Sequence, residues 1–423
     1  MLAMDVLADL VARGLVQDST DIEVLAGRLA EGPVTLYFGC DPTADSLHIG
    51  NLIGILVLRR FADAGHRPIA LAGGATGMIG DPSGRSEERN LLDDETLAKH
   101  LAGIGEQLQR IGRAPLVDNS EWTAGVGLLS FLRDVGKHVT VNQMVAKESV
   151  RTRMEGTDGI SYTEFTYMLL QANDYLRLHQ TRDVELQIGG SDQWGNITLG
   201  VDLVRKVAGH HVHALTWPLL TRADGKKFGK SADGTVWLSP ARTSPYQLHQ
   251  YFLQVPDADV RRMLLWFTLL PVAECEAIAD AHEADPPARH GQRRLAREVT
   301  ALVHDTAAAA GAEVAGEVLF GAELDDLGDG ALAALEGEVA TTVIARARLD
   351  EGIDPIDLFS ETGVASSRSD ARRSLDQGAL YLNNRRLAAD AADVGAGDLR
   401  AGRYLLLRKG KRTYHLVKAD VAS

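Results

Sequence analysis

Apolar and polar positions in the first half of the chain alternate between two spacings. Short β-branched and aromatic runs at 34–39, 68–73, 115–119 and 184–188 are typical of buried strands. Longer stretches at 52–64, at 88–111 and from Asn196 onward place their apolar or polar positions at helical spacing. Strands that alternate with helices predict an α/β fold, in which helices cover a parallel sheet in a doubly wound order.

Helical patterns dominate the middle of the chain. Residues 127–153 read as helical, with an apolar stripe through Leu129, Leu132 and Val135. In a doubly wound fold this stretch is an insertion, and we expect the stripe to form a contact between two subunits.

The strand signals stop after Ser239. Helical patterns at 244–255, 260–270 and 289–308 predict a second, all-α domain. Residues 311–347 are rich in Ala, Gly and Glu, which suggests a loosely packed connection.

Composition narrows the class of protein. A chain of 423 residues is too long for one hydrophobic core, and 45% hydrophobic with 24% charged residues is typical of a soluble globular protein. The start of the chain is not basic, and the longest apolar run, 263–273, is far shorter than the ~20 residues that span a bilayer. We therefore expect neither a signal peptide nor a membrane segment. Cys40 and Cys275 form no CxxC pair, which fits a reducing cytoplasm.

Charge is distributed unevenly along the chain. The net charge of −14 argues against nucleic-acid binding if it is read as an average. From Ser366 to the end, however, 12 Lys and Arg stand against 6 Asp and Glu. Ser366 can cap a helix with a basic face, and a turn ending in glycine then leads into a strand. The arginines of this region are Arg368, Arg372, Arg373, Arg385 and Arg386. They predict an RNA-binding surface, with a solvated basic face as the alternative.

The most informative motif follows the first predicted strand. It reads Gly39-Cys40-Asp41-Pro42-Thr43-Ala44-Asp45-Ser46-Leu47-His48-Ile49-Gly50-Asn51. His48 and Asn51 are neutral donors where a helix begins, and free N–H groups with the helix dipole attract phosphate there. Gly50 would let a nucleotide approach the backbone. A histidine in a loop is more often structural, so the motif alone leaves both interpretations open.

Two further patterns suggest binding groups. Lys227 and Lys230 flank a glycine in a polar loop, where they could neutralise charge on a triphosphate, although an isolated pair is more often a solvated turn. Tyr167, Gln171 and Asp174 are spaced i, i+4 and i+7 on one helix, so they project from the same face. Buried polar groups need partners, which leaves either a satisfied core network or a ligand site.

These motifs together resemble those of bacterial tyrosyl-tRNA synthetases, a family of class I aminoacyl-tRNA synthetases. The His48 block resembles the HIGH signature, with Asn51 in place of the final histidine, and Lys227 to Ser231 resembles the KMSKS loop. The basic C-terminal segment resembles an RNA-binding module that the family shares with a ribosomal small-subunit protein. The resemblance extends over about 29–417.

The resemblance implies a domain order. A Rossmann-like nucleotide-binding domain is expected at 1–243, with a helical insertion at about 122–160 and the KMSKS-like loop at 224–233. An α-helical anticodon-binding domain at 244–330, a linker at 331–352 and a small α+β RNA-binding module at 353–423 follow.

The implied reaction is the ligation of tyrosine to tRNA. ATP, as its Mg²⁺ complex, would activate tyrosine to tyrosyl-adenylate with release of pyrophosphate, and tyrosine would then pass to the 3′-terminal ribose of tRNA(Tyr). The mechanism requires positioning and charge stabilisation rather than a side-chain nucleophile. Tyrosine, ATP, tRNA(Tyr) and a second copy of the chain are the expected partners. No tightly bound cofactor, protein-held metal or membrane is expected.

The resemblance also implies a role for individual residues. The groups that stabilise the pyrophosphate part are expected to be His48, Asn51, Lys227, Lys230 and Ser231. The tyrosine-binding groups would be Tyr37 and Asp174 at the phenol, Asp81, Tyr167 and Gln171 at the ammonium, and Gln193 at the carboxyl. The ATP-binding groups would be Gly39, Asp41, Thr43, His48, Gly50, Asn51, Gly190, Asp192 and Lys230. A contact of Arg85 and Arg89 with pyrophosphate stays open.

Two rivals remain at this stage. One is a synthetase-like RNA-binding or regulatory protein that has lost catalysis, against which the intact set of His48, Lys227, Lys230 and the site carboxylates speaks. The other is a tryptophanyl-tRNA synthetase, which the paired phenol partners Tyr37 and Asp174 disfavour. The histidines His210, His211 and His213 are expected in a polar loop, because no carboxylate or Cys completes a metal site.

Overall fold

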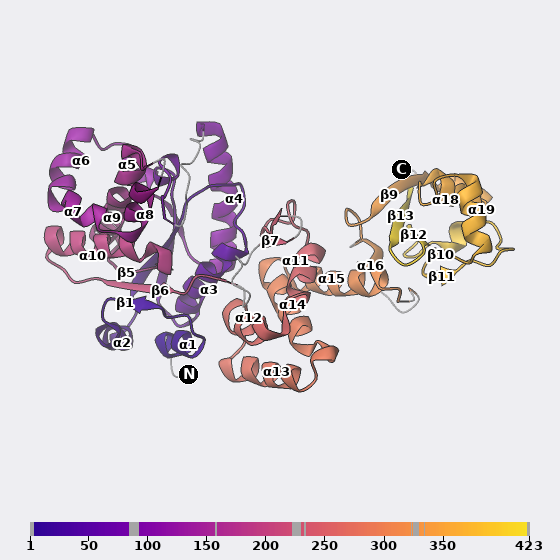
Figure 1. Cartoon of the computed structure of the whole chain (residues 1–423), viewed down its shortest axis with the longest axis horizontal. Coiled ribbons are helices and arrows are strands. Elements are labelled where there is room, and N and C mark those ends of the chain that lie inside the picture. The colour runs from indigo at the N-terminus through magenta and orange to yellow at the C-terminus, as the bar shows by residue number, and fades with distance from the viewer. Residues whose placement is uncertain are drawn as a thin grey trace. The chain divides into compact units, whose positions relative to one another are not determined.

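The chain divides into two compact units. The computed structural model describes residues 4–83, 93–156, 159–221, 230–231, 234–322, 324, 330–333 and 335–420. One unit comprises Met1–Arg242 with Val255–Leu295, and the other comprises Thr243–Gln254 with Ala296–Ser423. Figure 1 labels their helices and strands.

The first unit is built on a sheet that the described residues form in the order β1-β6-β5-β2-β3-β4. Its strands are β1 (Asp18–Ser19), β2 (Thr35–Cys40), β3 (Arg67–Ala72), β4 (Leu116–Asp118), β5 (Val184–Gly190) and β6 (His213–Trp217). All neighbours pair in parallel except β1, which runs antiparallel to β6. The order reverses between β2 and β5, which is the switch point where open α/β sheets bind ligands. The α/β prediction is confirmed.

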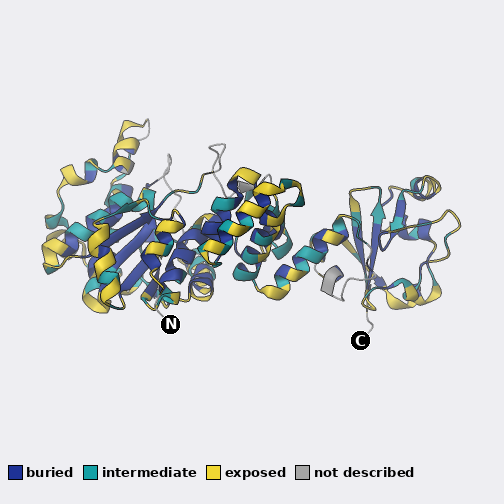
Figure 2. Ribbon diagram, turned by 90° about the horizontal axis from the view of Figure 1, so that it is seen from below, coloured by how far each residue is buried: buried dark blue, intermediate teal, exposed yellow. Residues whose placement is uncertain are grey.

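Helices flank this sheet. They include α1 (Val6–Ala12), α2 (Ile22–Glu31), α3 (Ile49–Asp63), α4 (Asp94–Gly112), α9 (Tyr162–Arg182) and α10 (Trp194–Ala208). In Figure 2 the central strands of this sheet are mainly buried, whereas the flanking helices expose residues to solvent. The wholly buried runs on α3, such as Leu52 to Leu58, explain why its sequence reads as continuously apolar.

The predicted insertion is helical. It contains α5 (Ser120–Thr123), α6 (Leu128–Asp134), α7 (Val141–Val145) and α8 (Glu148–Glu155). Leu128 and Leu129 are 71% and 80% exposed, and Leu132 and Val141 are exposed as well. Val135 differs from the expected stripe because it is buried in the core of the unit. The exposed large apolar side chains of α6 and α7 are therefore Leu128, Leu129, Leu132 and Val141.

Two helices that follow the KMSKS-like segment belong to the first unit, namely α12 (Val260–Phe267) and α13 (Val272–Ala284). Buried arginines tie α12 to α1 and α3. Arg13 donates to the carbonyls of Leu265 and Leu270 at 2.9 and 2.7 Å, and Arg60 donates to the carbonyl of Thr268. These bonds satisfy carbonyl groups that the end of a helix leaves without an intrahelical partner.

The second unit combines helices with a sheet in the order β11-β10-β12-β13-β9. Its strands are β9 (Ala340–Ala345), β10 (Leu380–Leu382), β11 (Arg385–Arg386), β12 (Tyr404–Lys409) and β13 (Thr413–Asp420). Its helices are α11 (Pro245–Leu253), α15 (Thr306–Leu319), α16 (Gly330–Ala333), α17 (Arg346–Glu351), α18 (Pro355–Glu361) and α19 (Arg368–Asp376), while α14 (His290–Val303) spans the boundary between the units. The segment 331–352, expected as a linker, contributes β9, which pairs in parallel with β13.

A shared core joins the helical and sheet parts of the second unit. Ala315 and Val318 of α15 pack in one cluster with Leu406 of β12 and Leu416 of β13. In the predicted domain order these residues belong to an anticodon-binding domain and to an RNA-binding module. None of the described helices combines the length and apolar character that crossing a bilayer requires.

Candidate active site

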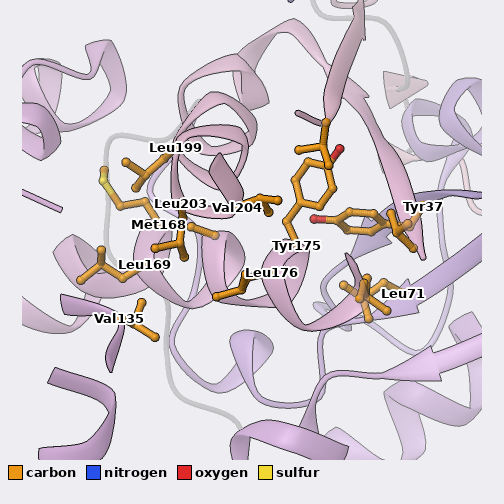
Figure 3. Packing of buried hydrophobic residues seen from close by; sticks show 14 of the residues in the cluster. Tyr37, Leu71, Val135, Met168, Leu169, Tyr175, Leu176, Leu199, Leu203 and Val204 are labelled. Atoms are coloured by element: carbon orange, nitrogen blue, oxygen red, sulfur yellow. The ribbon is translucent and has the colours of Figure 1, made fainter. Parts of the chain in front are cut away.

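Tyr37 and Asp174 are two buried polar residues in the first unit. Tyr37 on β2 is 1% exposed, and its hydroxyl has no hydrogen-bond partner among the described residues. Its ring packs edge to face on Tyr175, with 5.4 Å between centroids (Figure 3). Burial, followed by the charge of Asp174, raises the pKa of Tyr37. The phenol is therefore neutral and close enough to Asp174 to be influenced by that carboxylate.

Asp174 of α9 is held by two donors. Asn119 Nδ2 lies 2.9 Å from its Oδ2, and Trp122 Nε1 lies 2.8 Å from its Oδ1. Burial raises the pKa of Asp174 to about 7, although both hydrogen bonds act in the opposite direction. A carboxylate desolvated in this way is a strong acceptor for a hydroxyl.

Neither Asn119 nor Trp122 was predicted as a site residue. Asn119 is fully buried directly after β4, and its Oδ1 accepts from the backbone N of Ala75 at 2.8 Å. Its place at the carboxyl end of a predicted strand was a usable signal, because such ends meet at one edge of a parallel sheet. Trp122, on the short helix α5, offered no comparable signal.

A second polar cluster joins the next predicted residues. Gln193 Nε2 donates to Asp81 Oδ2 at 2.7 Å, and Gln171 Nε2 donates to Gln193 Oε1 at 3.3 Å. Asn196, which the sequence did not single out, donates to Gln171 Oε1 at 3.0 Å. The structure thus brings Asp81, Gln171 and Gln193 together from a loop, α9 and the turn after β5.

Tyr167 connects this cluster with the signature loop. Its hydroxyl donates to Asp41 Oδ2 at 3.0 Å, and Thr76 Oγ1 donates to Asp41 Oδ1 at 2.9 Å. Burial raises the pKa of Tyr167, and the charges of Asp41 and Asp81 add to the effect. Several carboxylates around neutral hydrogen-bonding groups make this a place that favours a cation.

The helix that follows the signature loop is capped by the signature itself. His48 is the N-cap of α3, and its Nδ1 accepts from the backbone N of Gly50 at 3.1 Å. Asn51 Oδ1 accepts from the backbone N of His48 at 3.1 Å. Because Nδ1 acts as an acceptor, the neutral imidazole carries its proton on Nε2. The amide oxygen of Asn51 has a capping role that the sequence did not predict.

The position of the His48 ring leaves room only for glycine at position 50. A Cβ at Gly50 would lie 2.8 Å from Cε1 of His48, so a larger residue would displace the ring. The same reasoning applies at the end of β5, where a Cβ at Gly190 would lie 2.6 Å from Oδ1 of Asp192. Burial, followed by the charge of Asp81, raises the pKa of Asp192.

The predicted ATP-binding residues occupy adjacent strand ends. Gly39 ends the apolar part of β2, and the backbone N of Thr43 donates to the carbonyl of Asp41 at 2.9 Å in the loop that follows. Gly190 and Asp192 lie at the end of β5, the neighbour of β2. The two groups therefore flank the switch point of the sheet.

The KMSKS-like residues are described only in part. Lys230 and Ser231 form β7 (Lys230–Ser231), which pairs with β8 (Gly234–Thr235). Lys227, Arg85 and Arg89 lie outside the described residues. Among the three histidines set aside as metal ligands, His210 Nδ1 lies 2.8 Å from His179 Nε2, and His213 begins β6.

The predicted RNA-binding arginines lie on the second unit and are all exposed. Arg368 and Arg373 form ion pairs with Asp357 and Asp370. Arg386 donates to the carbonyl of Gln377 at 3.2 Å. Arg372 projects from α19, and Arg385 lies in β11.

Comparison with known proteins defines the class. Residues 29–321 match the family described as class I tRNA synthetases for tryptophan and tyrosine, to which the chain therefore belongs. Residues 337–417 match the family described as the tyrosine–tRNA ligase SYY-like C-terminal domain. The tyrosine–tRNA ligase of Opitutus terrae is 51% identical, covering 98% of this chain and 100% of the relative. The tyrosine–tRNA ligase of Roseiflexus castenholzii is 47% identical, with 98% and 99% covered. Within the class, the chain is thus a member of the tyrosine–tRNA ligase family, which activates tyrosine and charges it onto tRNA.

Solved structures show the same fold. A C-terminally truncated mitochondrial tyrosyl-tRNA synthetase of Aspergillus nidulans superposes with a TM-score of 0.69 at 31% identity, covering 75% of this chain and 94% of that chain. The tyrosyl-tRNA synthetase of Archaeoglobus fulgidus complexed with L-tyrosine has a TM-score of 0.54 at 17% identity, with 71% and 98% covered. At that identity the likeness concerns the fold alone.

Proposed function

We propose that Tyr37 and Asp174 receive the phenol hydroxyl of tyrosine. The observation that carries this assignment is the pairing of a buried, unpartnered Tyr37 hydroxyl with a buried Asp174 carboxylate. A phenol between them would donate to Asp174 and bond with Tyr37. In a purely apolar core, a buried hydroxyl without a hydrogen-bond partner would only cost free energy. A ligand that supplies the missing partner would remove this cost.

The cluster around Asp81 is proposed to hold the amino-acid end of the substrate. The ammonium would bind between Asp81, Tyr167 and Gln171, whose acceptor atoms suit a cation. Gln193, which already donates to Asp81, would orient the carboxyl group. Ordering this network before the substrate arrives lowers the cost of orienting the reacting carboxylate.

ATP is proposed to lie across the carboxyl ends of β2 and β5. Asp192 would bond to the ribose, while Gly39, Asp41, Thr43, Gly50 and Gly190 would line the nucleotide site. The Mg²⁺ ion would arrive with ATP as part of the substrate, and its positive charge would help to neutralise the phosphates.

In the chemical step a tyrosine carboxylate oxygen attacks the α-phosphorus in line. The new O–P bond forms as the bond to the pyrophosphate oxygen breaks, and pyrophosphate leaves with the electron pair. The Nε2–H group of His48, with Asn51, lies at the positive end of α3 and would stabilise the developing charge, together with Lys227, Lys230 and Ser231. A ribose hydroxyl of tRNA then attacks the tyrosyl carbonyl carbon, and AMP leaves.

The remaining assignments follow the same domain order. The exposed face of Leu128, Leu129, Leu132 and Val141 is proposed to form a two-fold homodimer interface. Residues 244–330 are proposed to contact the anticodon, and 353–423 to bind RNA through their arginines, with 331–352 between them. A cytoplasmic location is supported by Cys40 and Cys275, which form no disulfide.

Pyrophosphate exchange with ATP tests the proposal. Each amino acid is supplied in turn, and label should pass from pyrophosphate to ATP with tyrosine alone at a high rate. Exchange with tryptophan instead would contradict the phenol site. No exchange with any amino acid, together with retained tRNA binding, would favour the inactive RNA-binding alternative.

A further inference from the structure

One face of α4 lies directly on the signature loop. His100 Nδ1 lies 3.0 Å from the carbonyl oxygen of Pro42. A Cβ at Gly103 would lie 2.0 Å from the carbonyl oxygen of Asp45, so the loop rests on the helix backbone itself. Any larger residue at position 103 would push the loop away. The loop that precedes His48 is therefore supported from α4.

Gln107, one turn further along this face, bonds to the same loop. Its side chain is buried, at 3% exposed. Its Oε1 accepts from the backbone N of Leu47 at 2.8 Å, and its Nε2 donates to Ser46 Oγ at 3.0 Å. Both ends of the carboxamide are thus used on two consecutive residues of the loop.

The Ser46 hydroxyl extends this network to a third segment. It donates to the carbonyl of Leu47 at 2.8 Å and accepts from the backbone N of Ser239 at 3.0 Å. With the bond from Gln107, its one proton and both lone pairs are engaged. A hydroxyl saturated in this way has one favoured orientation, and it fixes Ser239 relative to the signature loop.

The segment before Ser239 forms backbone hydrogen bonds with the residues on either side of His48. The backbone N of Leu238 donates to the carbonyl of Leu47 at 2.8 Å, and the backbone N of Ile49 donates to the carbonyl of Val236 at 3.1 Å. His48 lies opposite Trp237 in this antiparallel contact. The residue before Val236 is Thr235 of β8, which pairs with Lys230 of β7.

Strand pairing along residues 234–238 therefore relates two distant signature residues, His48 and Lys230. His48 and Lys230 are far apart in the sequence, but β7, β8 and the 236–239 segment place their backbones in a defined register. Gln107 is the side chain that connects this paired segment to α4, through its bonds with Ser46 and Leu47.

We propose that Gln107 is a positioning residue for adenylate formation, acting by holding the register between His48 and Lys230. The inference rests on the proposed function, in which these two residues stabilise the same developing charge. Gln107 itself contacts no reacting atom. Its loss should slow the transfer step without weakening tyrosine binding, because the tyrosine-binding residues lie on β2 and α9 and in the loops around them.

The first experiment compares Gln107→Leu with Gln109→Leu in the full-length chain. Gln109 is exposed on the same helix, so it is a matched control. Gln107→Leu is expected to slow ATP–pyrophosphate exchange about 10- to 100-fold, as displacement of catalytic groups does, with tyrosine affinity unchanged within about twofold. Gln109→Leu should behave as the wild type. Unchanged exchange, or equal losses in rate and in tyrosine affinity, would overturn the proposal.

A double-mutant cycle separates positioning from a general loss of structure. If Gln107 acts through the register, Lys230→Ala should cost much less in the Gln107→Leu background than in the wild type. Losses that simply multiply would contradict the proposal. If Gln107→Leu does not fold, Ser46→Ala replaces it in the same cycle, since it removes the bond to Ser239. Tyrosine-dependent exchange by the wild type tests the proposed function separately, because it does not depend on the outcome of the double-mutant cycle.

Discussion

The indole Nε1 of Trp122 donates to Asp174 Oδ1 at 2.8 Å, while the other carboxylate oxygen accepts from Asn119. These donors fix the carboxylate close enough to Tyr37 for its charge to raise the pKa of that phenol, and the two groups form the proposed phenol site. A site built in this way should distinguish strongly between ligands with and without a hydroxyl.

Selectivity for tyrosine over phenylalanine is the first consequence. Without the hydroxyl, Tyr37 and Asp174 would be left unpaired on binding. The expected discrimination is about 10⁵, a general value that was itself established for this class of enzyme and not deduced from the present structure. Asp174→Ala should narrow the ratio of the exchange rates by removing the buried carboxylate. A ratio near one in the wild type would contradict the assignment.

The protonation of Asp174 should be visible in the pH dependence of stability. Its pKa is about 7 in the folded chain and near the ordinary aspartate value of 3.8 when the chain is unfolded. Between these values the folded state holds a proton that the unfolded state has lost, so the free energy of unfolding falls as pH rises. The difference is on the order of a few kcal/mol. Asp174→Asn lacks this proton, so its thermal midpoint relative to wild type should rise from pH 4.5 to pH 7.5 and then level off.

Asp370 supplies the control for that measurement. Lys409 and the neighbouring backbone hold its pKa below the usual range, so the group is ionised in both states above about pH 5. The midpoint of Asp370→Asn relative to wild type should show no trend between pH 5 and pH 8. A flat difference for Asp174→Asn as well would mean that the Asp174 carboxyl is not desolvated.

The two lysines of the KMSKS-like segment should act on the transition state. Lys227→Ala and Lys230→Ala are expected to reduce the rate of adenylate formation by about 10²-fold or more, with little change in tyrosine affinity, because they meet charge that develops during transfer. Single-turnover rates and tyrosine titrations measure the two quantities separately. Lys411→Ala, in the second unit, removes the same charge as a control. Equal losses in rate and in affinity would make the segment structural.

The insertion face should control association. Leu129→Asp places a charge on the exposed apolar face and is expected to convert a dimer into monomers at micromolar concentration. Val24→Asp changes a comparably exposed apolar residue on α2 and should leave the dimer intact. Sedimentation velocity distinguishes the species. A wild-type monomer would refute the proposed interface.

Binding of tRNA should depend steeply on salt. Arginines that contact phosphates release condensed counterions, so log affinity falls linearly with log salt concentration. Replacing Arg372 and Arg373 by Ala should reduce that slope by roughly one to two, whereas tyrosine-dependent exchange should stay unaffected. Replacing the exposed Arg346 and Arg348 of α17 provides a matched control. An unchanged slope in the Arg372 and Arg373 variant would assign that surface another role.

Helices and strands with strong apolar runs could be predicted from the sequence, whereas short strands with polar or small residues could not. β2 and α3 were predicted because both are buried along nearly their whole length, so few polar residues interrupt their apolar sequences. β6 was missed because His213 and Thr216 make a short buried strand look polar. β9 was missed because an Ala- and Thr-rich edge strand has only Ile344 buried.

The site was predictable at the level of motifs and less so at the level of contacts. The spacing of Tyr167, Gln171 and Asp174 already indicated a shared helix face. Spacing could not show that Asn119 and Trp122 complete the environment of Asp174, because that depends on how α5 packs beside α9. Nor could it show that Asn51 directs its oxygen to a backbone N–H, since donor and acceptor share one side chain.

The parallel pairing of β9 with β13 has a consequence for synthesis of the chain. These strands lie side by side in Figure 1, although about one sixth of the chain separates them in the sequence. Domains generally fold as units while the ribosome is still at work, the N-terminal one first. The first unit closes at Leu295, but the last sheet cannot close until its final residues have left the ribosome. Until then β9 remains an unpaired strand edge, so translation that stops early yields a chain with an aggregation-prone end.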